Sequence, residues 1–248
     1  MAESWLRRMS KLALSRRPAI APSSIVLAAS GPDAVNLYDG TLAPLGIGAG
    51  LLLTSGTTPG TINTVGWFGQ DNSGASGFSN GDPNIDAVVN TVFNTQSYDA
   101  TTLAFDFTVA DPTATSVSFD VVFGSDEYPE WVDQFVDCAI VMVNGVNYAL
   151  FNHDPMHPLS VISSNLAAGY FQDNAGNALP IEYDGVSHVL KIVAPIIPGA
   201  TIVSRSVSPI PAITFMTVAF FSRTLPRATF RVPASSRPPI RERTITTL

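Results

Sequence analysis

From Ser24 onward the chain alternates short apolar runs with stretches of Gly, Pro, Asn and Asp. Each run has the length of a strand and is rich in β-branched or aromatic residues, and turn residues bound it. The runs are SIVLAA (24–29), GLLLTSG (50–56), LAFDFTV (103–109), SVSFDVVF (116–123), CAIVMV (138–143), NYALF (147–151), LSVIS (159–163) and HVLKIVAP (188–195). This pattern predicts an all-β protein, an antiparallel, jelly-roll-like β-sandwich.

The run at 116–123 shows the two-residue period of a strand. Val117, Phe119, Val121 and Phe123 fall on one face, so we expect that face to line the core.

One segment has helical spacing instead. In DPNIDAVVNTVF (82–93), Asp82 can cap a helix that starts at Pro83, and its apolar residues at 85, 88, 89 and 92 form one stripe. We expect one short helix here.

The stretch between Gly56 and Asp82 is rich in Gly, Ser, Thr and Asn and has too few apolar residues for a core of its own. It is predicted to be an extended surface loop, a type of segment that often carries function.

The composition supports one core with extensions. The chain has 248 residues, of which 46% are hydrophobic and only 13% charged, about half the usual charged share. A chain of this length can bury a single sizeable core.

Charge is distributed unevenly. Of the 20 acidic residues only Glu3 and Glu242 lie outside 22–203, which leaves 18 there; five of the 13 basic residues precede this segment and seven follow it, which leaves Lys191. The formal charge of 22–203 is therefore −17, and such a surface repels nucleic acid and anionic lipid. We accordingly predict three parts: a basic N-terminal extension (1–21), a β-sandwich domain (22–203) and an Arg- and Pro-rich tail (204–248).

The single cysteine, Cys138, lies inside an apolar run and is expected to be a buried, inert thiol. No segment has the roughly 18 consecutive apolar residues of a membrane span, and the N-terminus shows no readable export signal.

Five carboxylates follow the strand predicted at 116–123: Asp126, Glu127, Glu130, Asp133 and Asp137. Ca²⁺ accepts six to eight oxygen ligands in flexible geometry, which suits an irregular acidic loop better than the strict octahedron of Mg²⁺. We interpret Asp126, Glu127 and Asp137 as candidate ligands, with Glu130 and Asp133 as outer contributors. The competing interpretation is a solvated turn whose acids keep a sheet edge soluble.

Two other acidic segments, FQDNAGN (171–177) and IEYDG (181–185), are interpreted mainly as turns, with a second, weaker cation site as the alternative.

The sequence also offers residues for an enzymatic site. Glu127 and Glu130 could form the acid and base of a glycoside hydrolase, but no aromatic-lined cleft is legible in the sequence. HDPMH (153–157) has zinc-ligand residue types, yet Pro155 and the following Pro158 disfavour the helix that such sites use, so a surface loop is expected. The chain also lacks a GxSxG elbow. We therefore predict no catalytic residues and no enzymatic activity.

The order of several segments resembles the bacterial choice-of-anchor L domain, over roughly 37–203. The segments are LGIGAGLLLTSG, YDATTLAFDFTV, VSFDVVFGSDEYPEWVDQFVDCAIVMVNG, GYFQDN and IEYDG. The resemblance implies an extracellular or cell-surface β-rich module, structural or adhesive, without established catalytic chemistry and with acidic loops suited to Ca²⁺. The implied partners are a surface or matrix protein or a polysaccharide. The Ser-Glu-Glu-Tyr core of the family appears here as Ser125, Asp126, Glu127 and Tyr128.

The C-terminal part departs from the family, whose members close with a strand similar to IADTGDxxYDSGVF. Codons that spell VADTGDHIYDSGVF spell SPIPAITFMTVAF when they are read one base later, and this chain has that second peptide at 208–220. We therefore predict a frameshift near Val203, with a genuine disordered tail as the alternative. The domain would then lack its C-terminal strand and expose an open sheet edge, so we expect a destabilised, aggregation-prone product. The N-terminal extension is similarly interpreted as a misassigned start.

Sequencing the gene across codons 202–205 tests the frameshift. We expect the family's closing strand in the neighbouring frame. An uninterrupted frame ending in RERTITTL at the same locus in related strains would contradict this prediction.

Overall fold

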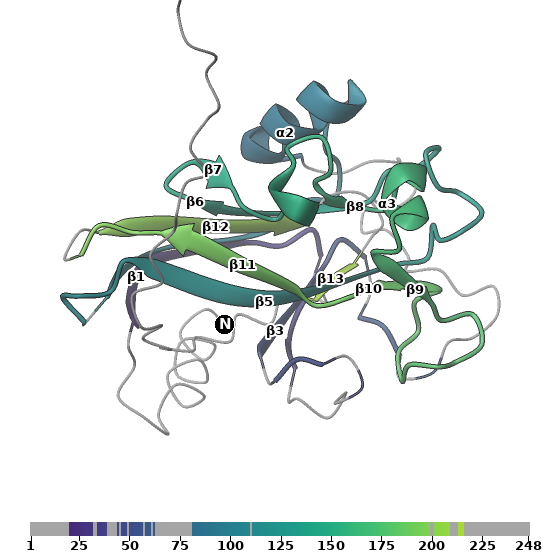
Figure 1. The fold of residues 1–248 in the computed structure, drawn as a ribbon, viewed down its shortest axis with the longest axis horizontal. Helices are drawn as coiled ribbons and strands as arrows, with labels where there is room; N and C mark the ends of the chain where they lie inside the picture. Colours follow the sequence, from purple (N-terminus) through teal and green to yellow (C-terminus); the bar gives the residue numbers. More distant parts are fainter. Residues whose placement is uncertain are drawn as a thin grey trace, which may run out of the picture.

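A computed structural model describes residues 20–31, 34–38, 44, 46–48, 50–56, 58–60, 62, 81–109, 111–198, 201–208 and 213–215. Within these residues the strands form two antiparallel sheets (Figure 1). The first has six strands in the order β1 (Ile20–Ala28), β4 (Thr101–Val109), β12 (Ile202–Ser208), β6 (Cys138–Val143) and β7 (Val146–Asn147), with β8 (Leu159–Ser160) also paired to β6.

The second sheet has seven strands. Their order is β2 (Val35–Tyr38), β3 (Gly50–Thr54), β13 (Ile213–Phe215), β5 (Ser116–Ser125), β10 (Gly185–Ser187) and β9 (Phe171–Asp173), with β11 (Leu190–Pro195) paired to β5. The predicted all-β sandwich is confirmed.

The main core lies between the two sheets and is built by alternating residues. Phe105 and Phe107 of β4 face Phe119 and Phe123 of β5 in one cluster, and each of these side chains is almost completely buried. The predicted inward face of 116–123 is therefore confirmed. The opposite face of β5 is also partly buried, because Val122 lies in a second cluster with Ile181, Tyr183 and Val186.

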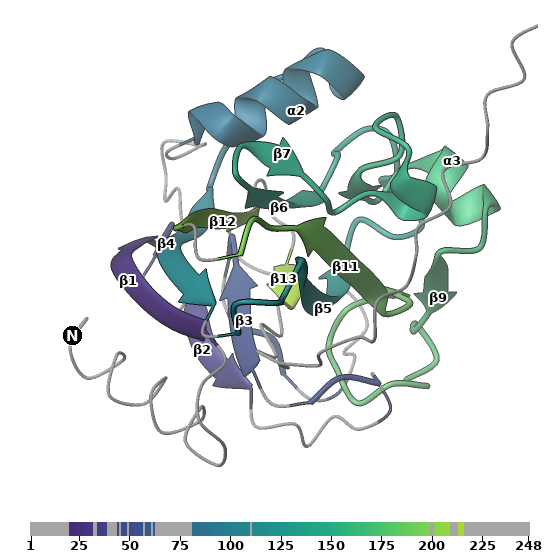
Figure 2. The same ribbon diagram turned by 60° about the vertical axis from the view of Figure 1, so that its left-hand side comes forward.

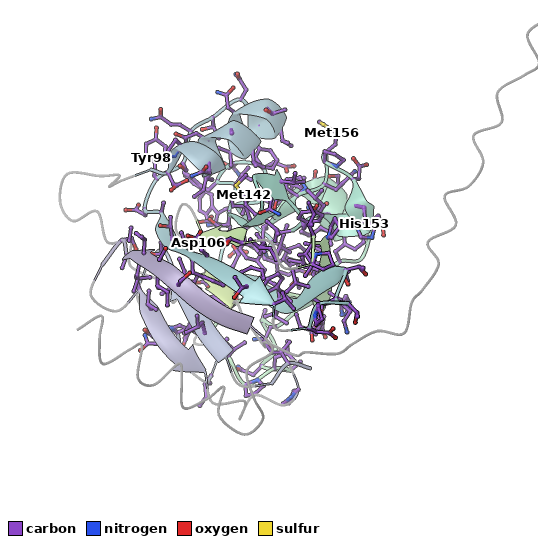
Figure 3. All side chains as sticks on the ribbon, turned by 90° about the vertical axis from the view of Figure 1, so that its left-hand side faces the viewer. Tyr98, Asp106, Met142, His153 and Met156 are labelled. Atoms are coloured by element: carbon purple, nitrogen blue, oxygen red, sulfur yellow. The ribbon has the colours of Figure 1, made fainter. Side chains whose placement is uncertain are left out.

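Helix α2 (Pro83–Phe93) covers the outer face of the first sheet (Figure 2). It begins as predicted: the Asp82 carboxylate accepts hydrogen bonds from the backbone N–H groups of Asn84 and Ile85. Ile85 and Val89 pack on Cys138 and Ile140 of β6, and Met142 contributes beneath the helix (Figure 3). The Cys138 thiol is buried, and burial raises its pKa, so the inert interpretation fits this environment.

Two shorter helical segments follow β7: a single 3₁₀ turn, η3 (Phe151–His153), and α3 (Ser163–Ala167). Two strands expected from the sequence, at 147–151 and 159–163, are therefore wrong in whole or in part. The run 147–151 is not a strand, since the chain leaves β7 at Asn147 and turns at η3, and the run 159–163 is a strand only at Leu159–Ser160. No helix in the described residues is long and apolar enough to cross a membrane.

We expected the closing strand to be absent, but residues after Val203 contribute to a strand in each sheet. β12 lies between β4 and β6, where Ser204 pairs with both Phe105 and Val143. β13 lies between β3 and β5, where Ile213 pairs with Thr54 and Gly124. The positions that would have formed an open edge are thus occupied by backbone after Val203. The frameshift itself stays a prediction, and most of the polar tract at 56–82 and most of the tail lie outside the described residues.

Gly124 of β5 gives a test of this packing. A Cβ atom built there would lie 2.4 Å from Cδ2 of the buried Tyr183 ring, a distance that side chains essentially never show. We expect Gly124→Ala to lower the free energy of unfolding by about 1–3 kcal/mol in urea denaturation, because the core must shift to accept the methyl group. Gly176→Ala is the matched control, since nothing lies within 4 Å of its Cβ position. Equal stabilities of the two variants would contradict the tight contact with Tyr183.

Candidate functional site

The acidic loop, residues 126–137, joins the end of β5 in the second sheet to the start of β6 in the first. One hydroxyl group ties its two ends together. Ser125 Oγ donates to Asp137 Oδ2 at 2.5 Å and accepts a hydrogen bond from the backbone N–H of Glu127 at 3.0 Å. The loop therefore closes on itself at the point where the chain crosses between sheets.

Asp137 is the innermost acid of the loop, with no exposed surface. Its Oδ2 atom has the bond from Ser125, but its Oδ1 atom is buried and has no hydrogen-bond partner among the described residues. Burial, and next the negative charge of Glu127, raise the pKa of Asp137 well above its usual range, against the lowering effect of the Ser125 bond. An ionised Asp137 thus requires compensation that these residues do not supply.

Glu127 is half-buried beside it. Burial and, secondarily, the charge of Glu130 raise the pKa of Glu127 from 4.5 to about 7. Asp126, also half-buried, adds a negative charge that further raises the pKa of Asp137. The three predicted inner ligands therefore do lie close enough to influence one another.

The IEYDG segment lies against the same loop, which the sequence interpretation did not anticipate. β10 pairs with the end of β5, with Gly185 opposite Ser125. A Cβ atom at Gly185 would lie 2.4 Å from the Tyr128 side chain, so Tyr128 packs directly over this glycine. The two acidic segments thus belong to one end of the second sheet.

Tyr183 is the functional candidate that sequence reasoning missed. Its side chain has no exposed surface. Burial, followed by the charges of Asp126, Glu182 and Asp137, raises the pKa of its hydroxyl group well above its usual value. Tyr183 therefore lies within electrostatic reach of the inner acids, and only the hydrophobic neighbours of IEYDG in the sequence hinted at its burial.

The two outer acids are placed differently. Glu130 and Asp133 are both exposed, and Asp133 Oδ1 accepts a hydrogen bond from the backbone N–H of Ser163 at the start of α3. Asp133 thereby fixes the loop against α3. Asp126, Glu127 and Asp137 are thus the more buried acids of the loop, while their roles as ligands and ion binding itself stay predictions.

The described residues contain no group of three or more His, Cys, Asp or Glu side chains already arranged around a common metal position. An ion at this loop would therefore need carbonyl, hydroxyl or water oxygens besides carboxylates, as Ca²⁺ accepts. Lys191 is the sole Lys or Arg in 22–203, and it forms its ion pair with Asp120, at 3.7 Å.

The other candidate sites find no support in the geometry. Glu127 and Glu130 do not line a cavity of about 280 Å³ that lies beside α2 and is formed by Gly81, Pro83, Asp86, Gln96, Ser97 and Tyr98. In the HDPMH segment, His157 Nδ1 lies 2.8 Å from Asn165 Oδ1, while His153 is exposed at the molecular periphery (Figure 3). This segment is a surface loop around η3, as expected.

Comparison with protein families gives one match. The family model described as choice-of-anchor L domain matches residues 19–203. This range contains the acidic loop, IEYDG and the helix α2. The chain matches no curated protein and no solved structure.

The raised pKa of Glu127 predicts how stability depends on pH in metal-free buffer. The folded protein keeps a proton on Glu127 that the unfolded chain releases, so this group lowers stability as pH rises from about 4.5 to about 7. Glu127→Gln removes this contribution, which is on the order of 1 kcal/mol because solvent screens the half-exposed group. Urea denaturation between pH 4 and 8 in EDTA should thus show a shallower decline for the variant.

Asp154→Asn is the control, because Asp154 is an exposed acid whose Oδ1 only accepts the Met156 N–H. Parallel pH profiles for wild type and Glu127→Gln would contradict the assignment of a raised pKa to Glu127.

Proposed function

Because this chain belongs to the choice-of-anchor L domain family, a surface-associated, non-enzymatic type of module, we propose that it is an extracellular structural or adhesive module whose acidic loop Ca²⁺ stabilises. The module holds its loops rigidly at one end of a β-sandwich, where they are available to a partner at the bacterial surface or in the matrix. It carries out no bond-making chemistry.

The observation that carries the calcium part is the environment of Asp137. A fully buried carboxyl group with one unpartnered oxygen, beside two further carboxylates, is stable only if it holds a proton or neighbours a cation. Proteins commonly use bound cations to compensate buried carboxylates. No described residue bonds to this oxygen of Asp137, which supports a cation as its partner.

Several features favour Ca²⁺ over other ions. The surrounding donors are all oxygens: the carboxylates of Asp126, Glu127 and Asp137, with the hydroxyl groups of Ser125 and Tyr183 nearby. Hard cations prefer such donors, and the irregular loop suits the flexible coordination of Ca²⁺. His and thiol ligands, which Zn²⁺ prefers, are absent from the loop, and the adjacent Cys138 faces α2.

A cation here would stabilise the fold as well as the loop. Its ligands would come from both ends of the connection between the two sheets, since Asp126 and Glu127 follow β5 and Asp137 precedes β6. Ligand binding to the folded state alone raises stability by mass action. The ion would thus fasten one sheet to the other where the chain crosses.

Calcium should raise the melting temperature of the full chain measured by differential scanning calorimetry. At 2 mM CaCl₂ against EDTA we expect a shift of several degrees, which corresponds to about 2–3 kcal/mol for a site with a Kd of 10–100 μM. Asp137→Asn should abolish the shift, whereas Asp154→Asn should keep it. Equal melting temperatures with and without CaCl₂ would refute the calcium part and leave the family assignment intact.

Calcium binding should also release protons at pH 6.5, because Glu127 has a pKa of about 7 and Asp137 a strongly raised one. Isothermal titration calorimetry in two buffers of different ionisation enthalpy measures this release. Identical binding enthalpies in both buffers would show that neither raised carboxyl group loses a proton to the ion.

A further inference from the structure

The acidic loop has an aromatic pair on its solvent side. Trp131 and Phe135 are each 48% exposed, and their ring centroids lie 5.9 Å apart with an angle of 57° between the planes. Among the described residues with large exposed hydrophobic side chains, these are the aromatic ones. Exposed, adjacent aromatic rings on a soluble domain often mark an interaction site.

The pair is not a by-product of core packing. Tyr128 and Val132 lie along the same turn and pack against the core between the sheets. Trp131 and Phe135 follow each of them by three residues and face the solvent instead. The loop thus has an inner apolar side that anchors it and an outer aromatic side that the fold does not require.

Backbone hydrogen bonds fix the turn that carries the two rings. The N–H of Trp131 donates to Glu127 O at 2.9 Å, and the carbonyl of Trp131 accepts from the N–H groups of Gln134 and Phe135 at 2.9 and 3.1 Å. Asp133 fastens the same turn to α3. A rigid aromatic surface binds with little loss of conformational entropy, which favours recognition by a small number of contacts.

We infer that Trp131 and Phe135 form a binding platform for a neutral polysaccharide. The inference rests on the proposed function, because it names the partner of that surface module. Aromatic faces pack against the C–H faces of sugar rings, and aromatic side chains combine a large apolar area with defined geometry.

The polar and acidic residues around Trp131 and Phe135 favour a neutral polysaccharide as the partner. Glu130, Asp133 and Gln134 are exposed beside the rings and offer oxygen acceptors to sugar hydroxyl groups. The segment 22–203 carries 18 acids and one base, so an anionic polysaccharide would be repelled. Two aromatic side chains also offer much less contact area than the roughly 800 Å² per partner of a stable protein interface, which favours a polysaccharide over a protein.

Affinity electrophoresis of the full chain tests this platform. The probes are three neutral polysaccharides, hydroxyethyl cellulose, dextran and galactomannan, with alginate as the anionic counterpart. We expect retardation by at least one neutral probe and none by alginate. Trp131→Ala should weaken the retarded binding by about tenfold or more, and Phe135→Ala by several-fold, because each removes one face of the platform.

Ile197→Ala is the matched control, because Ile197 is a 74% exposed apolar residue outside the loop, and it should bind as the wild type does. Unchanged melting temperatures would show that the loop variants fold. The inference is overturned if no neutral probe retards the wild type, if Trp131→Ala binds equally well, or if alginate binds best. It is also overturned if sedimentation velocity shows a dimer that Trp131→Ala dissociates, since the pair would then join two copies of this chain.

The same samples separate this inference from the proposed function. Failure of polysaccharide binding leaves the calcium-dependent melting of the wild type unaffected. Reducing ends released from a bound probe, and lost in Glu127→Gln, would instead refute the non-catalytic module while leaving the platform in place.

Discussion

Asp137 places a carboxyl group in the interior where the chain passes from one sheet to the other. Its position follows from the strand that it precedes, because β6 starts at Cys138 and is buried along nearly its whole length. Ser125 satisfies one carboxyl oxygen, and the neighbouring acids add negative charge instead of relieving it. The raised pKa of Asp137 and the proposed need for a cation both derive from this burial.

β5 connects that site to the rest of the fold. Its inward residues build the main core, and on its outer face Val122 packs with Ile181 and Tyr183. Gly124 leaves room for the Tyr183 ring, and Gly185 leaves room for Tyr128. Close packing on both sides of one strand end brings the two acidic segments together, so the packing of β5 and the chemistry of the loop are inseparable.

The acidic loop has a buried side and an exposed side. Its inner side contributes Tyr128 and Val132 to the core and holds the carboxylates that a cation would compensate. Its outer side displays Trp131 and Phe135 on a turn fixed by backbone hydrogen bonds. Such a division suits a family of surface modules, since stability and recognition then depend on different residues of one segment.

Local patterns in the sequence determined much of this protein. The alternation in β5, the Asp82–Pro83 start of α2 and the cluster of five acids were all readable, because strand period, helix capping and charge depend on residues a few positions apart. Tertiary structure alone decided which acids are buried, that IEYDG lies beside Ser125, and that β12 and β13 fill positions inside the sheets. These outcomes depend on strand pairings between residues far apart in the chain, whose partners and registers no local pattern specifies.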